Sequence, residues 1–280
     1  MGLVYAIANQ KGGVGKTTTA VNIATCVADA GHQVLLVDLD QQCNATVALG
    51  GDREATPSAY DCLTGSTSVA EAARPAGPDN LWLVPASRAL AGAAVELPRI
   101  EGSESQLRDS LGPVRERFGV TLLDCPPSLG PVTVNALVAA DRVIVPVQAE
   151  YLALEGLVQF LDTLDLLRRE LNPSLLLTGL VITMHDERTR LAQDVERELR
   201  DHFPDLVFDT VIPRSVRVAE APSFGVPVTT HAPSSRGSIA YRELAQELGR
   251  RERSDWIAVE DNPQAEVELS RSEDGSDGRG

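Results

Sequence analysis

The sequence predicts an α/β fold with a doubly wound, mostly parallel sheet flanked by helices. Two observations predict it. Short β-rich runs are apolar throughout, which is typical of parallel strands buried on both faces. Segments between some of these runs repeat leucine and valine every three or four residues, which is the spacing of an amphipathic helix. Because strands alternate with helices, we expect right-handed crossovers between parallel strands.

Each predicted strand is a short run rich in valine, leucine or isoleucine. In chain order these runs are residues 3–8, 33–39, 81–85, 119–125, 141–147, 175–183 and 206–212. The helical pattern predicts four helices, at residues 16–30, 153–171, 188–202 and 236–252. The first helix stops before Gly31, and glycine is common just past a helix end because it tolerates left-handed backbone.

Two segments fall outside this alternation. Residues 51–80 are rich in glycine, proline, serine and alanine, and we expect a surface excursion there. Residues 254–280 combine acids, serine and glycine with few apolar side chains, so we expect disorder because little apolar surface can offset the chain entropy. The expected organisation is one folded domain, residues 1–253, followed by an acidic tail, residues 254–280.

Length and composition exclude several classes of protein. A chain of 280 residues that is 43% hydrophobic can bury one substantial core. No apolar run approaches the length of a membrane span, and the first residues lack the pattern of a secretion signal. The cysteines are scattered without a CxxC pair, which indicates reduced side chains and a cytoplasmic location. They are Cys26, Cys43, Cys62 and Cys125.

The charge is strongly acidic, with a formal net charge of −15. Lys11 and Lys16 are the only lysines in the chain, whereas arginine is frequent. Carboxylates retain water and hydrated cations, so acidity with few lysines favours a high-salt, halophilic cytoplasm. A codon bias toward arginine is the alternative explanation.

A glycine-rich loop follows the first predicted strand and reads KGGVGKTT. Its glycines allow successive backbone N–H groups to face one anion, and the following helix adds the positive end of its dipole. Lys16 can reach the β- and γ-phosphates of a nucleotide, and the Thr17 hydroxyl can ligate Mg²⁺. The predicted nucleotide-binding residues of this loop are Gly12, Gly13, Val14, Gly15, Lys16, Thr17 and Thr18. The loop predicts a P-loop NTPase, although Gln10 stands where the strict GxxxxGK[ST] pattern has a glycine.

This loop resembles the deviant Walker A motif of the ParA/MinD class of P-loop ATPases, whose mark is an extra early lysine, here Lys11. The resemblance runs from about residue 3 to about residue 250 and is closest to the chromosomal ParA, or Soj, type. It implies Mg²⁺-dependent ATP hydrolysis by a homodimer that forms with ATP. It also implies that Lys11 reaches the phosphates of the partner subunit's ATP, as an arginine finger does.

Acids follow two further predicted strands, at the edge of the sheet where ligands bind in such folds. The resemblance implies that Asp38 acts through the shell of the Mg²⁺ ion and that Asp40 orients the attacking water. Asp124 occupies the Walker B position, where a carboxylate holds Mg²⁺ through water. Gln41 and Cys43 replace a proline and a glycine that the family usually has in this loop.

Later segments extend the resemblance. It places Glu150 near the dimer interface and the nucleotide, and it makes Pro213 and Arg214 the expected contacts of the adenine base. For a partition ATPase it further implies non-specific DNA binding by basic residues and stimulation by a ParB-type partner. The candidate DNA contacts are Arg217, Arg242, Arg250 and Arg251, and a DNA-binding protein of this kind would associate with the nucleoid.

Other members of the class remain as alternatives. A ParA-like ATPase can position protein cargo instead of DNA. A MinD-like ATPase binds the membrane through a basic amphipathic helix, whereas the end of this chain is acidic and rich in glycine. Iron–sulfur carriers of the class hold their cluster with paired cysteines, which this sequence lacks. We therefore expect a cytoplasmic partition ATPase without a membrane partner.

Overall fold

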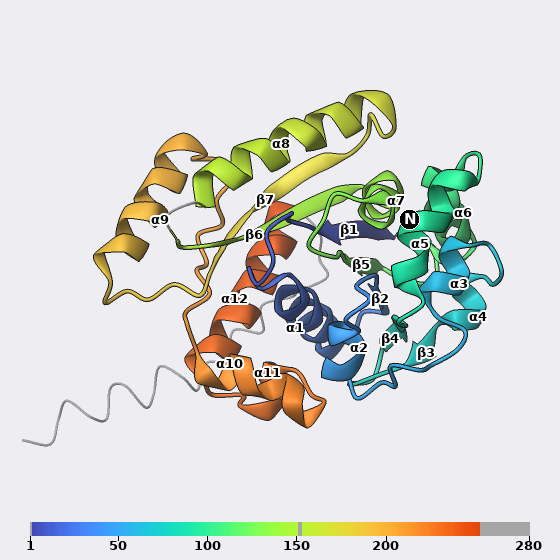
Figure 1. Cartoon of the computed structure of the whole chain (residues 1–280). Coiled ribbons are helices and arrows are strands. Elements are labelled where there is room, and N and C mark those ends of the chain that lie inside the picture. Colours follow the sequence, from blue (N-terminus) through green and yellow to red (C-terminus); the bar gives the residue numbers. More distant parts are fainter. Residues whose placement is uncertain (1, 151–152, 253–280) are drawn as a thin grey trace, which may run out of the picture.

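The computed structural model describes residues 2–150 and 153–252. Its centre is a seven-stranded sheet with the order β3-β4-β2-β5-β1-β6-β7 (Figure 1). All neighbours pair in parallel except β3, which runs antiparallel to β4 at the edge. The strands are β1 (Leu3–Ile7), β2 (Val34–Asp38), β3 (Arg74–Pro75), β4 (Leu81–Val84), β5 (Val120–Asp124), β6 (Arg142–Gln148) and β7 (Leu176–Thr183). The expected doubly wound α/β architecture is confirmed.

Helices connect these strands. The α-helices are α1 (Lys16–Asp29), α2 (Asn44–Ala48), α3 (Ala59–Leu63), α4 (Val69–Ala72), α5 (Leu90–Glu96), α6 (Gln106–Leu111), α7 (Pro131–Ala139), α8 (Ala153–Glu170), α9 (Arg190–His202), α10 (Val216–Glu220), α11 (Val228–His231) and α12 (Arg236–Arg251). Four short 3₁₀ turns, at Leu97–Arg99, Ser103–Ser105, Gly112–Val114 and Ala221–Phe224, complete the connections. None of the helices in the described ranges has both the length and the apolar character to cross a bilayer.

The central strands are buried on both faces of the sheet, which explains their unbroken apolar sequences. In β1, Val4 and Ala6 point to a core shared with α7 and α8, whereas Tyr5 and Ile7 point to a core shared with α1 and α12. Figure 1 shows α8 above the sheet and α1 and α12 below it. The carboxyl ends of the parallel strands are thereby left for loops, and the candidate site lies there.

The four predicted helices are present as α1, α8, α9 and α12, with ends that differ by two residues at most. Gly31 has a φ of +92°, and its N–H donates to the Ala28 carbonyl, as expected for the residue that ends a helix. Sequence periodicity did not indicate α5, α6 or α7. The first two are short, and α7 buries side chains around most of its circumference, so it has no polar stripe.

The predicted strand at residues 206–212 is wrong. Only Val207 and Pro213 form isolated bridges in this region, with Leu180 and His185. The N–H groups of Phe208 and Ile212 still donate to carbonyls of β7. Between these two residues the chain leaves the edge of β7, because the N–H groups of Asp209 and Thr210 donate to the carboxylate of Glu247 on α12. In a strand, successive N–H groups point to opposite sides, so Asp209 and Thr210 could not both donate to one carboxylate.

Glu247 makes this connection specific, and we expect Glu247→Gln to lower the free energy of unfolding by about 2–4 kcal/mol. The carboxylate is 5% exposed, accepts both N–H groups at 2.8 Å and pairs with Arg251 at 2.9 Å. An amide cannot match four donors. Urea denaturation at pH 7 measures the loss, and Glu243→Gln, an exposed change on the same helix, serves as the control.

The Glu247→Gln substitution should also change how the free energy of unfolding depends on pH in the acid range. Burial would raise the pKa of Glu247, but the hydrogen bonds from Thr210 and Asp209 and the charge of Arg251 hold that pKa below its ordinary value. The stabilisation is therefore present above the unfolded pKa of about 4.3 and is lost as pH falls through the lower folded pKa. Glu247→Gln should lose less stability on acidification, and equal losses in both proteins would contradict this assignment.

The expected surface excursion at residues 51–80 is also wrong in part. Two short helices, α3 and α4, form there, and each begins with a capping box, at Ser58 and Ser68. Leu63 and Val69 are fully buried in the same core as α7 and α8. Helices of four or five residues are too short to show periodicity, so the polar composition dominated the interpretation. The expected tail, residues 254–280, lies outside the described residues.

Candidate active site

The glycine-rich loop joins β1 to α1 as predicted. Gly13 and Gly15 adopt positive φ values of 74° and 87°, which glycine allows without the strain a side chain would cause. Gly15 immediately precedes α1, whose first residue is Lys16. Thr183 at the end of β7 donates from Oγ1 to the carbonyl of Val14 at 2.8 Å and supports the loop from below. The loop therefore presents the amino end of α1 to one anion.

Lys16 is 6% exposed, and its Nζ donates to the Lys11 carbonyl at 2.9 Å. Burial lowers the pKa of Lys16, and the carboxylates of Asp124 and Asp40 oppose that change. An ammonium group held by a backbone carbonyl can turn to an incoming phosphate without losing a strong ion pair. Lys16 lines the cavity beside the glycine loop, and its role as the phosphate-binding lysine stays a prediction.

Two carboxylates lie side by side at the carboxyl ends of β2 and β5. Asp38 and Asp124 are register partners on these neighbouring strands, and both are fully buried. Burial raises the pKa of Asp38 to about 6, although hydrogen bonds from Thr46 oppose this. Burial also raises the pKa of Asp124 well above its ordinary value, and the nearby Asp38 charge adds to that rise. Two buried acids this close need a cation to remain ionised.

The residues present fit a magnesium ion. Both carboxylate oxygens of Asp124 are buried without a well-formed hydrogen bond in the described part of the chain, and the Thr17 hydroxyl lies close enough to lower the pKa of Asp124. Mg²⁺ is usually held by one or two carboxylates together with substrate phosphates and water. Asp124 and the Thr17 hydroxyl would hold the ion here, and the ion would neutralise charge on the phosphates. Asp38 already accepts hydrogen bonds from the N–H and hydroxyl of Thr46, at 2.8 and 2.7 Å. It would therefore act on the Mg²⁺ ion through the shell around it and not as a direct ligand.

Asp40 lies two residues beyond the end of β2, in the loop that follows it. It is 8% exposed, and its Oδ1 accepts from the N–H of Gln42 at 3.0 Å. Cys43 follows with a φ of +56° and ψ of 33°, a left-handed conformation in which a non-glycine residue is strained. This explains the glycine that the family resemblance implies at this position. The loop keeps its shape with cysteine, since the Cys43 N–H still donates to the Asp40 carbonyl.

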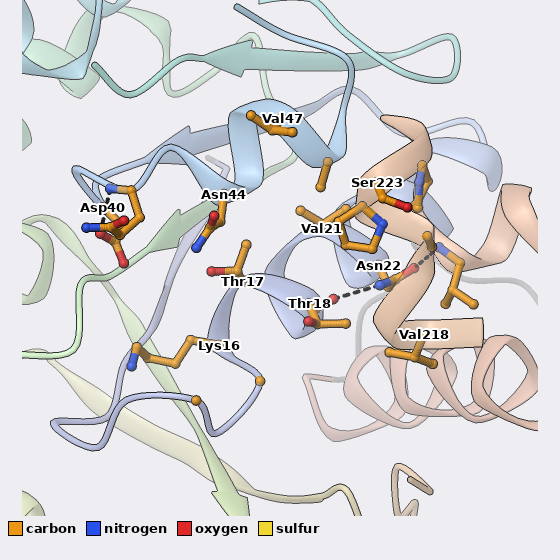
Figure 2. A pocket seen from close by; sticks show the side chains of 18 of the residues that line it. Lys16, Thr17, Thr18, Val21, Asn22, Asp40, Asn44, Val47, Val218 and Ser223 are labelled. Atoms are coloured by element: carbon orange, nitrogen blue, oxygen red, sulfur yellow. Dashed lines mark hydrogen bonds between the residues drawn. The ribbon is translucent and has the colours of Figure 1, made fainter. Parts of the chain in front are cut away.

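A cavity of about 610 Å³ joins these parts. Figure 2 shows Thr17 and Thr18 between Asp40 and Asn44 on one side and Val218 and Ser223 on the other. The wall beyond Ser223 is tied to α1, because Asn22 accepts from the Val228 N–H at 3.1 Å. The glycine loop and Asp40 thus form the polar end of the cavity, and apolar residues from 218–228 form much of the remaining wall.

Comparisons with known proteins agree with this geometry. Residues 2–177 match the protein family described as "AAA domain". The chain is 53% identical over 243 residues to the chromosome-partitioning ATPase Soj of Thermus thermophilus, covering 87% of this chain and 94% of that protein. It is 47% identical over 253 residues to the chromosome partitioning protein ParA of Caulobacter vibrioides, covering 89% and 95%. The chain belongs to the Soj/ParA family of P-loop ATPases.

A solved structure adds the ligands that the site predicts. It is cobyrinic acid a,c-diamide synthase from Mycobacterium smegmatis with an ATP analogue and magnesium. That protein is 38% identical to this chain with a TM-score of 0.80, and the match covers 91% of this chain and 97% of that one. The expectation of ATP and Mg²⁺ as cofactors agrees with this similarity, and the expected ATPase class is confirmed by the Soj/ParA family.

The signature lysine of the Soj/ParA family, Lys11, lies beside the cavity but does not line it. Its Nζ forms an ion pair with Glu150 at 3.2 Å, and the Gln148 amide donates to the other oxygen of Glu150 at 2.5 Å. The two side chains are 38% and 47% exposed. Glu150 therefore lies beside the glycine-rich loop, where its partner is Lys11, and its expected place near a dimer interface and the nucleotide stays a prediction.

The Soj/ParA resemblance also predicts Pro213 and Arg214 at the base. Both residues line a smaller cavity of about 210 Å³ rather than the larger one. The two cavities share Gly15, Thr18 and Val218, so they adjoin. Pro213 and Arg214 thus line the neighbouring cavity and not the one that holds the glycine loop and Asp40. Their contact with an adenine base stays a prediction.

The four arginines expected to contact DNA have different environments. Arg217 is 63% exposed and pairs with Glu220 one turn away, and Arg250 is exposed on α12. Arg242 donates to the Pro233 carbonyl at 2.7 Å. Arg251 is engaged within the protein: it pairs with Glu247, donates to two backbone carbonyls and lies 4.0 Å from the centre of the Phe208 ring. Because these contacts occupy its side chain, Arg251 is not retained as a candidate DNA contact.

Sequence reasoning missed the residues that support the site. Thr46 joins Asp38 to the Ala86 N–H, and so connects β2, α2 and the segment after β4. Asn9 holds the start of the loop, since its side chain accepts from the Lys11 N–H and donates to the Pro146 carbonyl. Single polar residues of this kind carry no pattern in the sequence, and only their partners reveal them.

Proposed function

We propose that this protein is a partition ATPase, in which an ATP-bound homodimer binds DNA without sequence preference and a ParB-type partner stimulates hydrolysis. Relatives named for chromosome partitioning match nearly their whole length to this chain. The proposal places the protein in the cytoplasm and, with ATP, on the nucleoid. ATP would complete the dimer, and loss of the γ-phosphate would release it.

The position of Lys11 carries this proposal. A lysine that served the ATP of its own subunit would be expected to line the cavity, as Lys16 does. Lys11 instead presents a partly exposed ammonium group beside the loop, held by the surface residue Glu150. This arrangement supports transfer of the Lys11 side chain to a second subunit, with Glu150 as its partner before the dimer forms.

Exposed arginines in the segments that follow β7 support the DNA-binding part. Besides Arg217, the side chains of Arg188 and Arg236 are 84% and 75% exposed, and both line a cavity of about 560 Å³ together with Arg214. Asp186 and Glu187 pair with two of these arginines, so phosphates would have to displace carboxylates. We therefore expect modest affinity per subunit and a strong contribution from dimer avidity.

A gel shift with random-sequence duplex DNA tests the proposal. DNA should be retarded with Mg-ATP and not with Mg-ADP, over a series of KCl concentrations. The halophilic interpretation of the −15 charge predicts that folding and ATP hydrolysis improve as KCl rises toward molar levels, because carboxylate repulsion is screened. Full ATPase activity at low salt would exclude the halophilic interpretation. Equal DNA binding with Mg-ATP and Mg-ADP would exclude control of DNA binding by ATP.

Arg217→Glu should reduce ATP-dependent DNA binding at least about tenfold while the protein still dimerises with ATP. The change removes one phosphate contact per subunit and adds repulsion to Glu220, which Arg217 now neutralises. Arg99→Glu, an equal charge change at an exposed position in the turn after α5, is the matched control. Unaltered DNA binding by Arg217→Glu would remove this residue from the interface.

Positioning of protein cargo is the second candidate function. It uses the same ATP switch, so the nucleotide site does not distinguish it from partition. The gel shift does, because a cargo ATPase that does not use DNA would leave DNA unretarded under every nucleotide condition. Neighbouring genes add a second distinction: a ParB-like gene favours partition, and a chemoreceptor or pilus cluster favours cargo.

A further inference from the structure

Besides the cavity at Pro213 and Arg214, one more cavity adjoins the 610 Å³ cavity of the glycine loop, at the loop that follows Asp40. The 610 Å³ cavity is termed the nucleotide cavity, and the one at the loop after Asp40 the second cavity. The volume of the second cavity is about 330 Å³, and it is lined by Gln41, Gln42, Cys43, Arg53, Arg88 and Ala91. Gln42 and Arg53 line both cavities, so the two spaces meet at these side chains. Asp40 lines the nucleotide cavity only, and its Oδ1 accepts from the Gln42 N–H.

The charge of this second cavity is opposite to that of the whole chain. The protein has 40 acids and 25 lysines and arginines, yet two arginines and no acid are among the described residues that line the cavity. Arg88 approaches only Glu54, at 3.7 Å, and these side chains are 75% and 71% exposed. A pair so long and so exposed contributes little, so a stronger anion can replace it.

Arg53 is the more informative of the two arginines. Within residues 2–150 and 153–252 it has neither an ion pair nor a hydrogen bond to its guanidinium group. It is also, together with Lys16, one of the two cationic side chains among the described residues that line the nucleotide cavity. An unpaired cation at the junction of two cavities can pass an anion from one to the other.

The ligand class follows from the donors. Two guanidinium groups and two glutamine amides present planar arrays of N–H donors, which suit a multiply charged oxyanion such as phosphate. Hydrolysis of ATP forms inorganic phosphate in the adjoining cavity: a water oxygen bonds to the γ-phosphorus, and the bond to the β–γ bridging oxygen breaks with its electron pair left on ADP. One proton of the water stays on the phosphate and the other passes to solvent. The carboxylate of Asp40 repels this dianion, while Arg53 and Arg88 attract it.

We propose that Arg53 and Arg88 form a phosphate site that receives the inorganic phosphate produced by hydrolysis. The site lies along the loop of residues 41–43, so the product can leave past Asp40 while ADP stays at the glycine loop. The proposal rests on the ATPase activity of the family and is independent of DNA binding or partition.

Calorimetric titration with inorganic phosphate tests the site directly. The full chain is saturated with Mg-ADP and titrated in a buffer without other oxyanions. Wild type is compared with Arg88→Gln, with the double variant Arg53→Gln/Arg88→Gln, and with Arg168→Gln. Arg168 lies in the last turn of α8, is exposed and lines neither cavity, so it controls for the lost charge. Thermal melts verify that each variant is folded.

We expect Arg88→Gln to weaken phosphate binding at least about tenfold, the double variant to abolish it, and Arg168→Gln to change it less than about twofold. Equal affinity in all four proteins would overturn the proposal. Phosphate binding that survives in the double variant but disappears in Lys16→Ala would place the anion at the glycine loop and would also overturn it.

A second titration, with a non-hydrolysable ATP analogue, separates free phosphate from the terminal phosphate of a bound nucleotide. Arg88→Gln should weaken inorganic phosphate more than it weakens the analogue, because Arg88 lines only the second cavity. If the analogue loses as much affinity as the free anion, the two arginines serve the γ-phosphate and not the product.

Discussion

Replacing Asp40 with alanine is expected to reduce ATP hydrolysis at least about a hundredfold and to leave ATP binding nearly intact. Asp40 is the one acid among the described residues that line the nucleotide cavity, and it is 8% exposed. Its place after β2 allows it to face a water beside the γ-phosphate, and positioning of a nucleophile typically contributes a factor of 10² or more. The buried acids Asp38 and Asp124 are untouched by the change.

Steady-state phosphate release measures the rate, and light scattering measures the mass. Since ATP persists in the variant, the proposed dimer should accumulate with Mg-ATP. Asp162→Ala, which removes an exposed acid from α8, is the control and should behave as wild type. A variant that stays monomeric with saturating ATP, or that hydrolyses ATP at the wild-type rate, would show that Asp40 does not have this role.

Lys11→Ala should bind ATP within a few-fold of wild type and yet lose hydrolysis at least about a hundredfold. ATP binding depends on Lys16 and the backbone of the loop in the same subunit, whereas Lys11 is directed to Glu150 and not into the cavity. A cation that arrives from the partner stabilises charge only in the dimer, and such a contribution can reach 10³–10⁵. Glu150→Gln is the matched control, because it releases Lys11 without removing it.

A mixture of two inactive variants decides between action in the same subunit and action across the dimer. In a mixed dimer of Lys11→Ala and Asp40→Ala, one nucleotide site has its own Asp40 and can receive Lys11 from the partner. If Lys11 acts across the dimer, mixing restores up to half of the activity per dimer. If it acts within its own subunit, neither site is complete and mixing restores nothing.

Much of the active site could be predicted from local sequence. The glycine loop is a continuous run whose chemistry depends on neighbouring residues, so its strand–loop–helix context was sufficient to place Gly13, Gly15 and Lys16. Asp38 and Asp124 were predictable for a similar reason, since each ends an apolar strand and parallel strands end at one edge of the sheet. The assignments of residues 51–80 and 206–212 were wrong. They relied on composition or on a short apolar run, and neither of these shows how a segment packs against the rest of the chain.

The sequence by itself determined the α/β class, the order of the main elements, the phosphate loop and its two lysines. The tertiary structure alone decided that Asp38 and Asp124 are register partners, that Lys11 pairs with Glu150, and that Glu247 draws the chain away from β7. It also decided that Arg53 faces both cavities. The physical reason is one of range. Helix, strand and turn preferences act between residues close in the chain, whereas these contacts join distant segments and exist only when the strand order and the packing of the helices bring them together.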